Sequence, residues 1–509
     1  MKVVFAFLVV VMIMCPPSTL QQPIKSAQAS TVTKIEEHSF FTDYYLEQPV
    51  ELYDLAVVGN IIWMTEYNVN KLWKYNIVTK DLTSVDLPDY ITPLIIRAAD
   101  DGSLWFLDFN FTPQNGTDYI VRYDPVTGDL HQILLPSVSQ PLDLEINKDL
   151  VYVSILNKDM ILKVNRTTYD VTEIPVECSD NCGPVGMAFD NQGNLWYADT
   201  FGPGIVEYIE HPLQNTSEFV YHDLPPIVRS PTYLHFDGNH TFWTGSHGGD
   251  QVVSFDINDN ESRIYNAPQT GPDQYPVSGI NDFGFDYTGD LWFTAHFTDR
   301  TGRIDIPSGT LLEYFIPHKD PYALMLSAVG DTIWYVQDQG ILTKINATKA
   351  PVVRISDFPE NFTVVNATSD INVHMTAEYV SGVHDSLDFQ LFGEARRSTK
   401  FSITGTPDTR TIQKGQKLDY DVTIHIKDDA HNGTYTFVLG IKTSEFTATK
   451  SFTITVQNML DVTQTENKSW FSLNFDPLLA GVVILCASIV IYTYRDDIQK
   501  LINKSKKKD

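Results

Sequence analysis

The sequence predicts an all-β fold: a seven-bladed β-propeller, then an immunoglobulin-like β-sandwich, and one C-terminal transmembrane helix. Three observations support this. An aromatic motif recurs at near-constant spacing between residues 63 and 334. After residue 350 the repeat stops, and alternating apolar runs typical of strands continue to about residue 458. A charge-free apolar run then lies near the C-terminus of the 509-residue chain. A chain of this length is expected to hold two or three domains.

Residues 1–29 have the pattern of a secretory signal peptide. Lys2 precedes an apolar run from Val3 to Met14. This run is too short to cross a bilayer, and Ala27-Gln28-Ala29 provides a small-residue cleavage site. We therefore expect the mature protein to begin after residue 29.

Residues 38–350 contain the repeat. The aromatic occurs in GNIIWMTE, DGSLWFLD, KDLVYVSI, QGNLWYAD, NHTFWTGS, TGDLWFTA and GDTIWYVQ, at Trp63, Trp105, Tyr152, Trp196, Trp243, Trp292 and Trp334. Each unit also has an alternating apolar run before the motif and two after it. Four strands in each unit of ~40–45 residues predict propeller blades. The third unit lacks the tryptophan, so six blades plus one degenerate unit is the alternative.

Closure of the ring explains why the aromatic is kept. A four-stranded blade cannot bury both of its faces alone. A large aromatic side chain between neighbouring blades supplies the apolar contact that buries them. A closed ring also needs one strand donated to the last blade. Residues 38–46 (HSFFTDYYL) have the pattern for this, and residues 352–355 (VVRI) are the alternative.

Residues 351–458 are predicted to form the immunoglobulin-like sandwich. Residues 459–474 are polar and read as a stalk. Residues 475–494 have the length and composition of a membrane helix. The basic tail at 495–509 places the C-terminus in the cytoplasm, because positive charge accumulates on that side. The rest of the chain then faces outward, on a single-pass cell-membrane protein.

Glycosylation signals and cysteines agree with an extracellular location. The N-x-S/T sequons lie at Asn110, Asn115, Asn165, Asn215, Asn239, Asn260, Asn346, Asn361, Asn366, Asn432 and Asn467. Cys178 and Cys182, in CSDNC, are expected to form a local disulfide outside the cell. The formal net charge of −28 argues against a nucleic-acid partner, which would need a basic surface.

The repeat also predicts a candidate site. The loop after the second strand of every blade lies on one face of a propeller, so residues just after the aromatic core share one mouth. They include Glu66, Asp108, Asp199, Asp338, His247 and His296. Carboxylates suit Mg²⁺ or Ca²⁺, and Glu66, Asp108 and Asp199 are the metal candidates. His296 and His247, in adjacent units, are the candidates for a catalytic base and acid.

The sixth unit, DLWFTAHFTDRTGRIDIPSGTLLEYFIP at residues 290–317, resembles the repeat of the virginiamycin B (streptogramin B) lyase family. Units one, two and four match it less completely, with WMTE, WFLD and WYAD. The resemblance implies a propeller that linearises a cyclic depsipeptide by elimination at its lactone, using Mg²⁺ with His and Glu at the mouth. The glutamate of the family's WFTE is Ala295 in the sixth unit.

Three functions remain open at this point. The first is a metal-assisted lyase acting on a cyclic ester. The second is a non-catalytic surface propeller that binds a glycan, a peptide or a neighbouring protein. The third is a lactone hydrolase similar to the gluconolactonase propellers. Polar residues are common at solvated propeller mouths whatever the function. His235 is expected to face solvent or core, and Glu313 is expected on the surface of an outer strand.

Overall fold

The computed structural model describes residues 28–29, 32–47, 49–66, 69–108, 119–135, 141–177, 182–202, 204–214, 216–268, 277–317, 322–358, 361–365, 370–396, 398–404, 409–427 and 430–457. Across these residues the secondary structure is β, apart from one 3-10 turn, η1 (Leu156–Lys158). The all-β prediction is therefore confirmed for the described chain.

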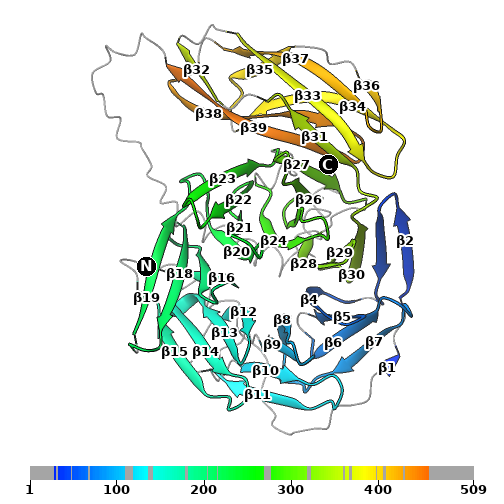
Figure 1. Cartoon of the computed structure of the whole chain (residues 1–509). Coiled ribbons are helices and arrows are strands. Elements are labelled where there is room, and N and C mark those ends of the chain that lie inside the picture. The colour runs from blue at the N-terminus through cyan, green and yellow to red at the C-terminus, as the bar shows by residue number, and fades with distance from the viewer. Residues whose placement is uncertain are drawn as a thin grey trace, which may run out of the picture.

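Successive four-stranded antiparallel sheets form the propeller (Figure 1). They comprise β4 (Leu52–Val58), β5 (Ile61–Glu66), β6 (Lys71–Asn76), β7 (Leu82–Asp86); β8 (Pro93–Ala98), β9 (Leu104–Asp108), β10 (Tyr119–Tyr123), β11 (Leu130–Leu134); β12 (Pro141–Asn147), β13 (Leu150–Ile155), β14 (Met160–Asn165), β15 (Val171–Pro175); and β16 (Pro184–Phe189), β17 (Leu195–Asp199), β18 (Gly204–His211), β19 (Thr216–Asp223). They continue with β20 (Pro231–Phe236), β21 (Thr241–Ser246), β22 (Gln251–Asp256), β23 (Glu261–Asn266); β24 (Ile280–Phe285), β25 (Leu291–Ala295), β26 (Arg300–Asp305), β27 (Thr310–Phe315); and β28 (Ala323–Val329), β29 (Thr332–Gln337), β30 (Ile341–Asn346).

The ring is closed by a strand from the N-terminal end of the chain. β3 (Phe41–Tyr45) pairs with β30, and β2 (Lys34–His38) pairs with β3 on its outer side. The innermost strands contact one another in chain order from β4 to β28, and β28 contacts β4. The latch therefore comes from the segment at 38–46. The alternative segment forms β31 (Val352–Ser356), which pairs elsewhere.

The recurring aromatic side chains are buried where neighbouring sheets meet. Trp196 of β17 packs against Phe242 of the next sheet, with tilted rings whose centroids are 4.6 Å apart. Trp334 lies 5.9 Å from Tyr75 of β6, across the point of closure. The repeated aromatic side chain is thus buried between neighbouring sheets, as the sequence predicted.

The turns before the motif have a chemical basis in their first residue. In the turn from β24 to β25, Asp286 Oδ1 accepts the backbone N–H groups of Thr288 and Asp290 at 2.9 and 3.2 Å. Its Oδ2 accepts the indole N–H of Trp292 at 2.9 Å. Gly289 takes a φ of +87°, a left-handed conformation that glycine adopts without steric cost. One aspartate therefore fixes both the turn and the orientation of the buried tryptophan.

The chain after residue 351 folds into two sheets around a shared core. One contains β31, β33 (Ile371–Ser381), β37 (Lys417–Ile426) and β35 (Phe401–Thr404); the other contains β39 (Phe446–Gln457), β38 (Gly433–Lys442), β34 (Ser386–Ala395), β36 (Arg410–Gln413) and, parallel to β39, β32 (Asn361–Val365). Buried residues of both sheets, including Met375, Tyr420 and Phe452, belong to one hydrophobic cluster.

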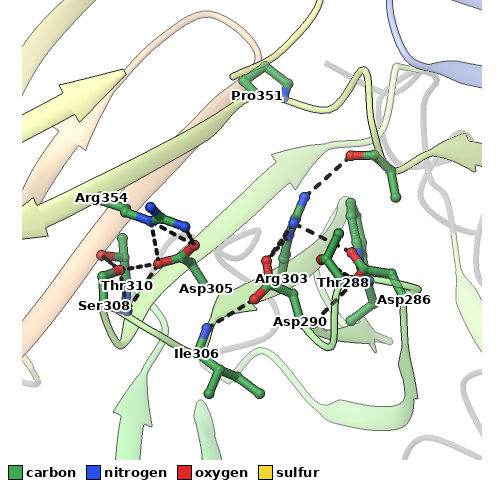
Figure 2. A network of polar contacts seen from close by, with 12 residues as sticks. Asp286, Thr288, Asp290, Arg303, Asp305, Ile306, Ser308, Thr310, Pro351 and Arg354 are labelled. Carbon is green, nitrogen blue, oxygen red and sulfur yellow. Dashed lines mark hydrogen bonds and ion pairs between the residues drawn. The ribbon is translucent and has the colours of Figure 1, made fainter. Parts of the chain in front are cut away.

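This C-terminal part continues a propeller sheet. β39 pairs antiparallel with β27, so the outer strand of the β24–β27 sheet is covered. Glu313 of β27 is consequently buried and pairs with Arg300 at 2.9 Å, so its predicted surface position is wrong. Figure 2 shows further contacts across the junction, where Arg354 of β31 makes a two-pronged pair with Asp305 of β26.

Several sequence predictions fall outside the described residues. Of the predicted signal peptide, only Gln28–Ala29 are described, as β1, which pairs with β7. The stalk at 459–474, the predicted membrane helix at 475–494 and the basic tail at 495–509 all lie outside. Within the described part of the chain, no helix has the length and apolar character needed to cross a membrane.

Candidate functional site

The three carboxylates predicted to bind metal end the second strands of their sheets, as the repeat required, and all are buried. Each is hydrogen-bonded to its own sheet. Glu66 Oε2 accepts the indole N–H of Trp73 at 2.7 Å. Asp108 Oδ1 accepts the backbone N–H of Thr92 at 2.8 Å, just before β8 begins. Both contacts fix the local fold.

Asp199 is held most firmly. Its Oδ1 accepts the backbone N–H groups of Gly183, Gly202 and Phe201 at 2.8, 2.9 and 3.3 Å. Burial raises the pKa of Asp199, and these three hydrogen bonds oppose that rise. Asp108 and Asp199 make equivalent contacts in their two sheets. Each links the end of the second strand of its sheet to the residue just before the first strand of the same sheet. Ser246, at the end of β21, makes a similar link to the backbone N–H of Arg229, two residues before β20, at 2.8 Å.

The two predicted catalytic histidines do come together. The rings of His247 and His296 lie edge to face, with centroids 5.5 Å apart. Phe297 lies 5.2 Å from the His247 ring, and Tyr322 lies 4.9 Å from the His296 ring. Burial lowers the pKa of His247 to about 4. Burial, and then the neighbouring His247, hold the pKa of His296 well below its usual value. Both imidazoles are therefore neutral near pH 7.

One buried nitrogen of this pair has no hydrogen-bond partner in the part of the chain that the structure describes. His296 Nε2 is buried, and no group of the described residues bonds to it. A buried polar atom without a partner is costly unless a ligand or water completes it. We call the group of four side chains His247, His296, Phe297 and Tyr322 the histidine recess.

The proposed metal ligands do not join this recess as a coordination set. No group of three or more His, Cys, Asp or Glu side chains in the described ranges is arranged to hold a metal ion. The carboxylates of Glu66, Asp108 and Asp199 instead serve the backbone and side-chain contacts given above. The residues therefore offer no ready ligand shell for Mg²⁺ or Ca²⁺, and binding of such an ion stays a prediction.

A second polar cluster, which the sequence analysis missed, lies in the central channel. Arg97 of β8 reaches Asp54 of β4 at 2.9 Å and Asp143 of β12 at 2.8 Å. It also contacts Glu145 at 3.2 Å. With Asp282 of β24, these groups line a cavity of about 270 Å³. One guanidinium thus faces four carboxylates.

The channel carboxylates also connect neighbouring sheets. Asp54 Oδ2 accepts the backbone N–H of Ile96 in the next innermost strand at 2.8 Å. Asp143 and Asp282 make the same contact with Met187 and Leu326, also at 2.8 Å. Each aspartate lies at a register shift in its strand, an irregularity that can redirect a side chain toward the neighbouring sheet.

Burial governs the pKa values in this channel. It raises the pKa of Asp143 to about 7, against the opposing effect of Arg97. Burial likewise raises the pKa of Asp282 to about 7. His235, which was expected to face solvent or core, lines the same cavity, and burial lowers its pKa to about 4. A signal was available in the sequence, because Asp54, Asp143 and Asp282 share one repeat position.

The sequons and cysteines are described in part. Asn239, Asn260, Asn361 and Asn432 are exposed, and Asn165 and Asn346 are half-buried; Asn110, Asn115, Asn215, Asn366 and Asn467 lie outside the described residues. Cys182 is disulfide-bonded. Cys178 lies outside the described residues, so the expected pairing stays a prediction.

No protein-family model and no curated protein matches this chain. Solved structures do match. Virginiamycin B lyase from Staphylococcus aureus is 18% identical, with a TM-score of 0.51, and the match covers 60% of this chain and 98% of that one. A catalytically inactive variant of that lyase with quinupristin is also 18% identical, with a TM-score of 0.51 and coverage of 60% and 99%. A streptogramin B lyase is 17% identical, with a TM-score of 0.51 and coverage of 61% and 99%. At this identity the likeness establishes a β-propeller fold similar to that of these lyases, and a shared fold does not carry a shared reaction.

Proposed function

We propose that this chain is a cell-surface binding protein, a seven-bladed propeller whose mouth holds a neutral, hydroxyl-rich ligand such as a glycan. A signal peptide would export it, and the helix at 475–494 would anchor it, with the propeller outside. The immunoglobulin-like sandwich and the stalk would hold the propeller above the membrane. Sequon glycans would cover part of this outer surface.

The observation that carries the proposal is the histidine recess. A neutral imidazole offers one donor and one acceptor, which matches a hydroxyl group that can both accept and donate. The aromatic rings of Phe297 and Tyr322 pack beside the two imidazoles. The buried His296 Nε2 gains a partner when a ligand hydroxyl reaches it. Because burial lowers the pKa of both imidazoles, the two histidines bring no charge to the recess near pH 7.

The test uses full-length protein in neutral detergent and a set of neutral oligosaccharides, with binding measured by calorimetry. We expect His247→Ala with His296→Ala to weaken binding by about tenfold or more, because each lost hydrogen bond is worth about 1 kcal/mol. His211→Ala is the matched control, since His211 is exposed and pairs with Glu218. Equal binding by all three proteins, or no saturable binding to any sugar, would remove the proposal.

A second candidate function is supported by the same histidines. Two neighbouring neutral imidazoles could exchange a proton with a substrate, and the fold is similar to that of virginiamycin B lyase. A bound divalent cation would polarise an ester carbonyl in such a reaction. In this reaction one histidine would take a proton from the carbon next to the one that bears the lactone oxygen. A C=C bond then forms between these two carbons, the C–O bond breaks, and the carboxylate is the leaving group.

Two measurements distinguish the binding function from the catalytic function. After chelation, added Mg²⁺ or Ca²⁺ should raise the melting temperature only if an ion binds the native state. Incubation with a cyclic depsipeptide, followed by mass spectrometry, then reports the reaction class. Elimination opens the ring without a change in mass, whereas a lactone hydrolase adds one water. An unchanged ring with a saturable sugar response would leave binding as the function.

A further inference from the structure

A second cavity lies at the junction between the propeller and the C-terminal sheets. It measures about 210 Å³ and forms where β23, the turn joining β26 to β27, and β39 meet. β39 pairs with β27 through residues 446–449 and then runs past this turn toward β23, which it contacts. The three elements come from distant parts of the sequence, and Figure 1 shows them close together at the edge of the ring.

The charge of this cavity is opposite to that of the protein. The chain carries a formal net charge of −28, yet the residues lining the cavity include Arg263 and Lys450 and no carboxylate. Within the described residues, neither cation forms an ion pair with a carboxylate. The acidic group that acts on Lys450 is Asp305, and Arg354 already holds it in a two-pronged pair at 3.0 Å (Figure 2).

Neutral groups of the cavity are oriented as donors. Asn266 is buried, and its Oδ1 accepts from the amide of Gln251 at 3.3 Å. Its Nδ2 therefore donates, to the Ser451 hydroxyl at 3.0 Å. Because the Ser451 oxygen accepts this bond, its own hydrogen is left to donate elsewhere. The phenol of Tyr265 lies on the same wall. Two cations and a hydroxyl group left to donate are the chemistry that binds an oxyanion.

We propose that this cavity binds a small oxyanion group, sulfate or phosphate, held between Arg263 and Lys450. The volume is below the ~300–1,000 Å³ typical of sites for drug-sized ligands, which favours a small group or the charged end of a larger molecule. The group can be a free ion or a substituent on an acidic glycan. This site is separate from the histidine recess and does not depend on the ligand proposed there.

Burial lowers the pKa of Lys450, which means that the surroundings penalise its charge. A bound anion would offset that penalty. Since the three walls come from the propeller and from β39, an anion would also bridge the two parts of the chain. Binding should therefore stabilise the native protein by mass action.

The experiment follows the melting temperature of the full-length protein in neutral detergent during titration with sodium sulfate or sodium phosphate. Sodium chloride at matched ionic strength corrects for screening. We expect a saturable rise of roughly 5 °C at a hundredfold excess over Kd. The variant Arg263→Gln with Lys450→Gln should lose this rise. Lys414→Gln with Lys442→Gln removes the same charge at exposed positions of the C-terminal sheets and should keep it.

A second arm of the same titration tests whether the anion is a free ion or a substituent on a glycan. A sulfated disaccharide that binds more tightly than inorganic sulfate would indicate a glycan substituent, and equal or weaker binding would indicate the free ion. The proposal is overturned if neither sulfate nor phosphate gives a saturable rise above chloride. It is also overturned if the Arg263 and Lys450 variant responds as the wild-type protein does.

Discussion

Replacing Arg97 by methionine removes the only guanidinium described in the central channel and keeps most of its apolar stem. The Arg97 side chain is 23% exposed, whereas its partners Asp54 and Asp143 are 2% and 1% exposed. Without the guanidinium, these carboxylates would keep buried charge that only backbone N–H groups offset. Removing one partner of a buried ion pair costs about 3–5 kcal/mol. Because Arg97 retains some contact with water in the channel, we expect about 3 kcal/mol at pH 8.

The loss should depend on pH. Asp143 and Asp282 have folded pKa values of about 7, above the unfolded value of about 4. A carboxyl whose pKa is raised on folding binds its proton more tightly in the native state, so stability increases as pH falls from about 7 toward 4. Without Arg97 these pKa values should rise further. The deficit of the variant should thus shrink at pH 5.5 by about 1 kcal/mol or more, since each pKa unit corresponds to about 1.4 kcal/mol.

The assay is urea unfolding of the full-length protein, followed by the fluorescence of the tryptophans buried between sheets, at pH 8 and pH 5.5. Arg122→Met is the matched control, because Arg122 is also 23% exposed but pairs at 3.5 Å with Asp101, which is 48% exposed. A surface pair of this kind contributes about 0–1 kcal/mol. If both variants lost the same stability, or if the Arg97 deficit were equal at the two pH values, the proposed role of the channel charges would be refuted.

Two further predictions concern the histidine recess and the latch. In an NMR titration, the His247 ring should stay neutral down to about pH 5, because burial lowers its pKa to about 4. The stability linked to this group is present above the unfolded pKa of about 6.5 and is lost as pH falls toward 4, and an ordinary titration near 6.5 would contradict the burial argument. In the latch, Tyr44→Ala should cost about 3 kcal/mol, since Tyr44 is 7% exposed and its ring lies 5.1 Å from Tyr75 and 5.8 Å from Trp334. Tyr90→Ala, at a side chain 42% exposed, should cost less than about 1 kcal/mol in urea unfolding, and equal losses would mean that β3 does not hold the ring closed.

The positions of the site residues followed from the repeat, but their roles did not. Because every unit places the same strand end at the same mouth, the sequence correctly put Asp108 and Asp199 at strand ends and His247 beside His296. It could not tell that Asp199 would accept three backbone hydrogen bonds. A carboxylate that caps a turn and a carboxylate that binds a metal are the same residue type at the same repeat position. Only the positions of the neighbouring backbone N–H groups distinguish the two roles.

Internal repetition determined the propeller, because alternating apolar residues, turn aspartates and one interlocking aromatic in each unit are local patterns that survive without knowledge of distant contacts. Tertiary structure alone decided three things: the closing strand, the burial of Glu313 beneath β39, and the meeting of Arg97 with the carboxylates of three other strands. Each joins segments far apart in the chain, and the energy of such contacts depends on desolvation in a closed ring. The pattern within a single repeat unit does not show how far a group is desolvated once the ring has closed.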